Sequence, residues 1–171
     1  MNQPSKPPPG DGYLKVPALD GKFDLDRVME FDEGRKRWCG KGQKWRVELE
    51  KTFGCEINDV YGGTFFSDND TGYLYFFGHY EWNGASGPTL DDPSLRLSSA
   101  IHDAICTKGP KGRRVVKSYW KRHEIYRRVM LAHCPYTSRI GKAYHVFRAW
   151  KHWLGLVACN WAWDLLKRAG Q

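Results

Sequence analysis

His102 and Asp103 stand side by side in the segment SSAIHDAIC, shortly after the glycine-rich loop YEWNGASGP. A neutral imidazole is a natural general base near pH 7. The carboxylate beside it suits a hard cation such as calcium, with loop carbonyls as the remaining ligands. Gly84 and Gly87 let the loop backbone turn its carbonyls inward. These residues predict a cleft that holds a base next to a cation site.

A purely structural interpretation of the same pair stays open. Adjacent residues on a helix diverge by about 100°, so His102 and Asp103 are expected to pair poorly with each other. They then either face two sides of one cleft, or His102 bonds a neighbouring backbone group while Asp103 lies in solvent. Because of the flanking loop, the functional interpretation stays open as well.

His123 lies on the apolar side of a second expected helix, where it should face the first helix. A histidine in such a position is either a hydrogen-bonded core residue or a ligand. If His102, Asp103 and His123 converge, a transition-metal site becomes an option.

The segment 108–128 holds nine Lys and Arg residues and one acidic residue, with Tyr119, Trp120 and Tyr126 interleaved. Basic residues with aromatics are typical of nucleic-acid grooves, and a solvated helix face with inward aromatics is the alternative. No helix-turn-helix, zinc-finger or RNP-type signature accompanies the segment. The candidate residues for anion or nucleic-acid binding are Lys108, Lys111, Arg113, Arg114, Lys117, Lys121 and Arg122.

The elements that must position these residues change character along the chain. Residues 13–66 alternate short apolar pieces with Gly, Asp and Asn, 45–49 alternates as a strand does, and 67–72 is a turn before a hairpin strand. Periodicity then predicts helices over 93–106, 115–133 and 138–154, and a short one from 157. The fold class predicted is α+β: an N-terminal antiparallel β layer, hairpin or meander, packed on a C-terminal bundle of three to four helices.

The expected helices carry definable faces. Asp92 before Pro93 is a capping pair for the first helix. Its apolar face is Leu97, Ala100, Ile101, Ala104 and Ile105, and that of the second is Val116, Tyr119, His123, Tyr126 and Met130. One side of the third carries Ile140, Tyr144, Phe147 and Leu154. We expect a flexible proline-rich leader over 1–12 and a single domain over 13–171, mainly β to 92 and mainly α from 93.

Charge is distributed unevenly over the 171 residues. The net charge is +8, but residues 1–100 carry −4 and residues 101–171 carry +12. This asymmetry predicts an anionic partner: a phage or host protein, lipid headgroups or nucleic acid. The five cysteines are scattered without a CxxC pair, which favours free thiols in a reducing compartment.

No apolar signal-peptide core follows the polar, proline-rich start of the chain. The most apolar stretch, 153–163, has about half the length that a membrane span requires. Trp150, Trp153, Trp161 and Trp163, beside Lys151, Lys167 and Arg168, either form an interfacial membrane patch or pack against the β layer. We expect a protein without a membrane span, located in a cytoplasm.

The loop YEWNGASGPTLDD followed by HDAIC resembles a phage and prophage family of unknown function with the signature WDGASGPT…HDALY…ADxLF. The resemblance covers about residues 70–155. It implies an origin in a tailed phage or prophage, with a location in the bacterial host cytoplasm and assembly into a virion as a further option.

More distantly, the same stretch is similar to phospholipases of the A-two class, in which a Tyr-Gly-rich loop precedes a helix bearing HDxCY. This resemblance implies that His102 is the base that activates a water. It implies calcium held by Asp103 and by the carbonyls of Tyr80, Trp82 and Gly84. Two positions differ: His123 stands where the orienting Asp is found, and Cys106 replaces the aromatic after the HD pair.

Three functions follow as expectations. The first is a phage- or prophage-derived accessory or virion-associated binding protein, with a cleft formed by the YEWNGASGP loop and His102/Asp103. The second is a calcium-dependent, phospholipase-like ester hydrolase in which His102, Asp103 and His123 form the catalytic group. The third is a nucleic-acid-binding accessory protein that uses the basic segment 108–128.

Overall fold

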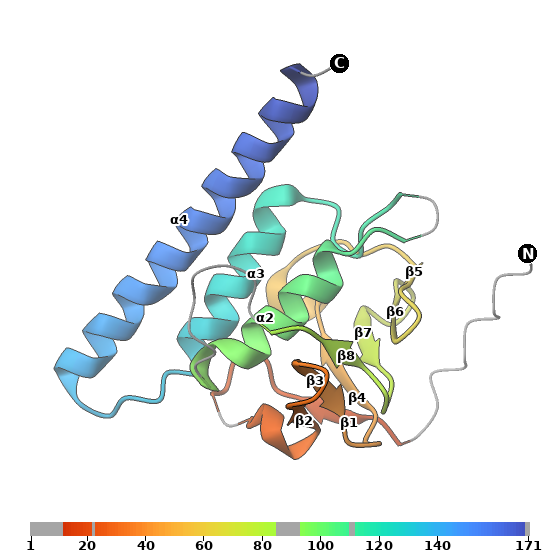
Figure 1. Ribbon diagram of the computed structural model, residues 1–171, viewed down its shortest axis with the longest axis horizontal. Helices are drawn as coiled ribbons and strands as arrows, with labels where there is room; N and C mark the ends of the chain where they lie inside the picture. The colour runs from red at the N-terminus through yellow and green to blue at the C-terminus, as the bar shows by residue number, and fades with distance from the viewer. Residues whose placement is uncertain (1–11, 22, 85–92, 110–111, 170–171) are drawn as a thin grey trace, which may run out of the picture.

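The computed structural model describes residues 12–21, 23–84, 93–109 and 112–169, without the side chains of 93, 94, 160 and 163–169. The leader over 1–11, the loop over 85–92 with its Asp92 cap, and Lys111 therefore lie outside the described residues. Strands fill the first half of the chain and helices the second, as the sequence predicts (Figure 1). The strands are β1 Leu14–Val16, β2 Met29–Asp32, β3 Arg37–Gly40, β4 Trp45–Glu48, β5 Val60–Tyr61, β6 Phe65–Asp68, β7 Tyr73–Phe76 and β8 Glu81–Trp82. The helices are η1 Leu25–Arg27, α1 Glu50–Phe53, α2 Pro93–Cys106, α3 Tyr119–Ala132 and α4 Arg139–Ala169.

The described strands form two sheets. The first has the order β1-β4-β7-β6-β5 and the second has the order β2-β3-β8. All pairings are antiparallel except β1 with β4, which is parallel. The turn predicted over 67–72 joins β6 to β7, with Phe65 opposite Phe76 and Asp68 opposite Tyr73. The predicted β layer is confirmed, with one parallel pair added.

Alternating apolar residues place the core between the first sheet and α2. Trp45, Val47 and Leu49 are fully buried, which confirms the strand predicted from their spacing. The rings of Trp45 and Phe76 stack with centroids 3.7 Å apart. The predicted face of α2 is buried throughout: Leu97, Ala100, Ile101, Ala104 and Ile105. Each fully buried large side chain stabilises the fold by roughly 1.5–3 kcal/mol, before the cost in chain entropy.

Glycines bring the second sheet close enough for β8 to reach α2. A Cβ atom at Gly40 would collide with the carbonyl of Gly78, and one at Gly78 with the carbonyl of Gly42. The amide of Gly40 donates to the carbonyl of Tyr80 at 2.8 Å. Close backbone approach at these glycines therefore sets the position of the residues that follow, including Trp82.

Helix α3 begins at Tyr119, later than the predicted start at 115. Ser118 caps it, with Oγ accepting from the amide of Lys121. The preceding residues are extended because they pair with a distant segment: the carbonyl of Val115 accepts from the amide of Asn58 at 2.7 Å, and Val116 bridges Ile57. Tertiary pairing thus overrides helical periodicity over 115–118.

Helix α4 corrects the prediction of two C-terminal helices, because it runs without a break from Arg139 to Ala169. The expected gap between 154 and 157 contains Gly155, yet a glycine inside a helix costs only about 1 kcal/mol and no proline follows it. The hydroxyl of Tyr119 donates to the carbonyl of Val157 at 2.8 Å, which ties the helix to α3 beyond that point.

The helices are layered outward from the sheets: α2 contacts α3, and α3 contacts α4, which slants along the outside of the molecule (Figure 1). Among the described side chains of α4, His145 and Ala149 are buried, and His145 Nε2 donates to the carbonyl of Met130 at 2.7 Å. In the described part of the chain, no helix is both long and apolar enough to cross a membrane.

Candidate functional site

A pair of buried histidines joins the first two long helices. Nε2 of His102, on α2, lies 3.0 Å from Nδ1 of His123, on α3. His102 is 7% exposed and His123 is 1% exposed. The rings of Tyr119 and Tyr126 meet the pair edge-on, Tyr119 against His123 and Tyr126 against His102. Helical periodicity on both helices thus brings together two titratable groups that stand 21 residues apart in the chain.

Cys106 lies one helical turn after His102. Its Sγ is 3.4 Å from the same Nε2 of His102. Residues four apart on a helix share a face, which explains the contact. Unlike the two histidines, Cys106 is only half-buried. Nε2 of His102 is therefore contacted from two sides, by an imidazole and by a thiol.

Asp103 approaches the other nitrogen of His102. Its Oδ1 is 3.7 Å from Nδ1 of His102, a distance that suits an ion pair but is long for a hydrogen bond. Its Oδ2 accepts a hydrogen bond from Nε1 of Trp82 at 2.9 Å. The indole from β8 thus holds the carboxylate in place, and the divergence of adjacent helical residues keeps its contact with His102 long.

The two histidines have opposite pKa shifts. Burial lowers the pKa of His102, but hydrogen bonding and charge interactions with Asp103 and Cys106 outweigh it and raise the pKa to about 9. Burial, followed by the charge of His102, lowers the pKa of His123 to about 4. Near neutral pH the pair therefore carries one positive charge, on His102, while His123 is neutral.

A pocket of about 650 Å³ opens beside this group. Asp103, Cys106 and Thr107 close it on the α2 side, and Trp82 closes it on the β8 side. The two histidines are not among the described residues that line it, and His102 lies directly behind Cys106, whose Sγ it contacts. The remaining lining residues are Arg37, Gly62, Thr64, Phe65, Tyr80, Glu81 and Asn83.

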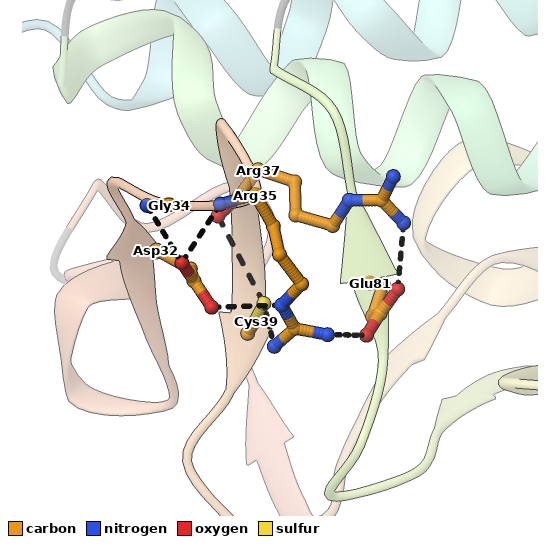
Figure 2. A network of polar contacts seen from close by, with 6 residues as sticks. All are labelled: Asp32, Gly34, Arg35, Arg37, Cys39 and Glu81. Carbon is orange, nitrogen blue, oxygen red and sulfur yellow. Dashed lines mark hydrogen bonds and ion pairs between the residues drawn. The ribbon is translucent and has the colours of Figure 1, made fainter.

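An ion-pair network forms the outer rim of the pocket. Figure 2 shows Arg35 between two carboxylates, with Nε 2.7 Å from Oδ2 of Asp32 and a terminal nitrogen 2.6 Å from Oε1 of Glu81. Arg37 binds the other oxygen of Glu81 at 2.9 Å, and Arg35 also reaches Sγ of Cys39 at 3.1 Å. Hydrogen bonding from Arg37 lowers the pKa of Glu81. The network links the β2–β3 hairpin to β8 and so fixes two pocket residues, Arg37 and Glu81.

The calcium prediction receives no support from the described geometry. One oxygen of Asp103 is bonded to Trp82, and the carbonyl of Tyr80 accepts from the amide of Gly40. Gly84, with φ +88°, is the last residue before the segment 85–92. No group of three or more His, Cys, Asp and Glu that could hold a metal ion occurs among the described residues. Calcium at Asp103, Tyr80, Trp82 and Gly84 stays a prediction.

Several cations of the predicted basic surface bind groups of the protein itself. Arg122 is buried, and one of its guanidinium nitrogens donates to the carbonyls of Val116 and Lys117. Lys117 pairs with Glu56 at 2.8 Å. Lys121 pairs with Glu124 at 2.9 Å. The candidate nucleic-acid residues therefore do not form one uniformly exposed surface.

Two residues that matter most in this geometry have roles the sequence did not indicate. Cys106 contacts His102, although the sequence marked it only as a departure from a family pattern. The side chain of Trp82 binds Asp103, whereas only its carbonyl was considered. The spacing His102-x-x-x-Cys106 on a predicted helix is the signal that identifies the first. No local signal identifies the second, because β8 and α2 meet only in the folded chain.

Comparisons of this chain with protein-family models, with curated proteins and with solved structures find no match. Its function is therefore argued from the geometry of the site.

Proposed function

We propose that this protein is a hydrolase of acyl esters in which the thiol of Cys106 is the nucleophile. One observation carries the proposal: Cys106 Sγ contacts Nε2 of His102, Asp103 lies at Nδ1 of the same ring, and Cys106 and Asp103 line the pocket. A nucleophile, a base and a group that orients the base recur in this order in covalent hydrolysis. Distances of 3.4 and 3.7 Å are typical of sites that tighten when substrate binds.

The first half of the reaction is acyl transfer to sulfur. With its proton held by the imidazolium of His102, the sulfur of Cys106 attacks the carbonyl carbon of the bound ester. The new C–S bond forms as the carbonyl π electrons move to oxygen. When they return, the C–O bond to the alcohol breaks, and the departing alkoxide takes the proton from His102. The products are the free alcohol and an acyl thioester on Cys106.

The second half is hydrolysis of that thioester. His102, now neutral, takes a proton from a water molecule, which attacks the same carbonyl carbon. The C–S bond breaks, the acid leaves, and the thiolate regains its imidazolium partner. Asp103 holds the ring and stabilises its positive charge throughout, while Trp82 holds Asp103. Ester and water are converted to acid and alcohol without any further reactant.

Two cations stand beside the sulfur of Cys106. The pKa of His102 is raised to about 9, so a positive charge stands next to the sulfur at neutral pH. The guanidinium of Arg122 also interacts with Cys106, although burial lowers the pKa of that arginine. Cations beside the sulfur are typical of the surroundings of reactive cysteines.

A second candidate function is a binding protein without chemistry, derived from a phage or prophage as the loop and HD motif suggest. The observation that favours it is the contact between His102 and His123, which at 3.0 Å is shorter than the contact to sulfur. If Nε2 of His102 donates a hydrogen bond to Nδ1 of His123 and is not available to the thiol, the pair is a structural link between α2 and α3. The pocket then holds a ligand without converting it.

Thiol reactivity decides between the two functions. We expect a short pulse of iodoacetamide at neutral pH, followed by peptide mapping, to alkylate Cys106 about tenfold faster than the half-buried Cys134 of the same molecule. Cys55 is an internal negative control, because burial raises the pKa of its thiol to about 11. His102→Gln should slow alkylation of Cys106 and leave that of Cys134 unchanged.

The opposite result is equally clear. If Cys106 and Cys134 react at the same rate and His102→Gln changes neither, the thiol is not activated and the hydrolase proposal is wrong. Circular dichroism of His102→Gln checks that the variant is folded. A panel of fluorogenic short-chain and long-chain esters then defines the substrate class for an activated thiol.

A further inference from the structure

The outward face of α4 exposes large apolar side chains instead of burying them. Ile140 is 85% exposed, and Phe147 and Trp161 are each 64% exposed. Tyr144 and Leu154 are more than half exposed as well. Ile140, Tyr144, Phe147 and Leu154 are the residues that the sequence predicts along one side of a helix, and the structure turns that side away from the core. Contiguous exposed apolar surface of this kind marks an interaction site.

The spacing of these residues keeps them on one side of the helix. Ile140, Phe147, Leu154 and Trp161 recur every seven residues, which shifts their direction by only about 20° per step. His145 and Ala149, on the opposite side, are buried against α3. One face of the helix therefore packs against α3. A second, apolar face extends about 32 Å from Ile140 to Trp161.

The charge around this face is of one sign. Residues 125–163 contain six Lys and Arg and no Asp or Glu. On α4 itself, Arg139 and Lys151 are exposed beside or on this face, whereas Lys142 lies about 200° around the helix from Ile140. A second copy of the chain would bring these cations against their own counterparts, which opposes self-association. An anionic surface complements them.

We propose that the outward face of α4 docks on an anionic lipid surface, with the helix axis parallel to the membrane plane. An exposed apolar face rich in aromatics and flanked by Lys and Arg is typical of helices that lie at the boundary of headgroups and acyl chains. Phe147 and Leu154 would enter the acyl boundary. Tyr144 and Trp161 would lie at the headgroup level, where tyrosine and tryptophan are enriched.

A cation–aromatic contact adds a second group at the edge of this face. Trp150 is 43% exposed, and the guanidinium of Arg127 lies over its ring at 4.2 Å. Arg127, on α3, is thereby placed beside the apolar face with its charge available to a phosphate. No described residue of α4 lines the pocket beside Cys106, so lipid docking is independent of the proposed hydrolysis.

The experiment is co-sedimentation of the protein with vesicles. We expect binding to vesicles of equal parts phosphatidylglycerol and phosphatidylcholine, weaker binding to phosphatidylcholine alone, and partial loss of binding in high salt. The double variant Phe147→Ser/Leu154→Ser should weaken binding at least about tenfold. The matched control is Phe31→Ser, because Phe31 is an exposed apolar residue on β2, away from α4. Cys106→Ser should bind as well as the unaltered protein.

Two results would overturn the proposal. One is vesicle binding that the double variant leaves unchanged, since another surface would then be responsible. The other is absence of vesicle binding together with a dimer, measured by light scattering, that the double variant dissociates. In that case a second copy of the chain covers the face. An effect of Cys106→Ser on ester hydrolysis alone would leave lipid docking intact, so the two proposals fail separately.

Discussion

In most proteins polar side chains lie in solvent and apolar side chains are buried. Two regions depart from this arrangement in opposite ways: the contact between α2 and α3, and the outward face of α4. At the first, His102 and His123 are buried and Nε2 of His123 has no hydrogen-bond partner among the described groups. At the second, Phe147 and Trp161 lie in solvent. Both arrangements cost stability, because a buried polar group loses its water and an exposed apolar group orders it.

The comparison separates the side chains that stabilise the core from those that the fold accommodates at a cost in stability. The apolar face of α2 that carries Ile101 and Ile105 is buried throughout, and the polar His102 is buried beside it. The α4 face has the periodicity of a core helix but no core to enter. Departures of this kind are better guides to function than the well-packed remainder of the molecule.

The largest effect expected concerns the thiol. Cys106→Ser should lower ester hydrolysis by about a thousandfold or more, because a hydroxyl beside His102 is a much weaker nucleophile than a thiolate. Initial rates on the most rapidly cleaved ester measure it, and Cys134→Ser is the matched control. Activity retained in Cys106→Ser would mean that the buried pair of His102 and His123 has a structural role only.

Truncation of apolar residues should give the next largest difference. Ile101→Ala, in the core, should lower the free energy of unfolding by about 2–5 kcal/mol. Phe147→Ala, on the outward face of α4, should change it by about 0.5 kcal/mol or less. Urea titrations of both variants measure the contrast. A large loss in Phe147→Ala would show that a self-contact in solution covers this face.

The histidine pair should make stability depend on pH in both directions. The folded-state pKa of His102, about 9, is above its unfolded value, so its contribution is complete below about pH 6.5 and is lost as pH rises through 9. The folded-state pKa of His123, about 4, is below its unfolded value, so stability falls as pH falls from about 6.5 toward 4. Each side is expected to span about 1–3 kcal/mol.

Urea titrations across this pH range test the assignment residue by residue. His102→Gln should flatten the alkaline side, and His123→Gln should flatten the acid side. The same alkaline slope in His102→Gln and the unaltered protein would show that another group titrates there.

The smallest effect is expected at the rim of the pocket. Glu81→Gln weakens the ion pairs of Glu81 with Arg35 and Arg37. Since all three side chains are substantially exposed, the melting temperature should stay close to that of the unaltered protein. Thermal melts at low and high salt measure it. A marked loss at both salt concentrations would mean that the network stabilises the second sheet.

Local pattern was sufficient for much of the architecture. The strand at Trp45–Glu48, the turn before β7 and the whole apolar face of α2 follow from periodicity and turn residues, since neighbouring residues along the chain decide them. The helix predicted over 115–118 and the gap predicted between 154 and 157 are wrong. Pairing with Ile57 and Asn58 extends the first segment, and contact with α3 holds α4 together past the second.

The candidate site divides in the same way. By itself, the sequence determined that His102 and Asp103 share a helix with Cys106, and that the C-terminal half is basic, because composition and spacing are properties of the chain. Only the tertiary structure decided that Cys106 and Asp103 face a pocket, that Trp82 holds Asp103, and that the apolar side of α4 faces solvent. Each of these depends on which surfaces meet when distant segments pack, and no local pattern of residues contains that information.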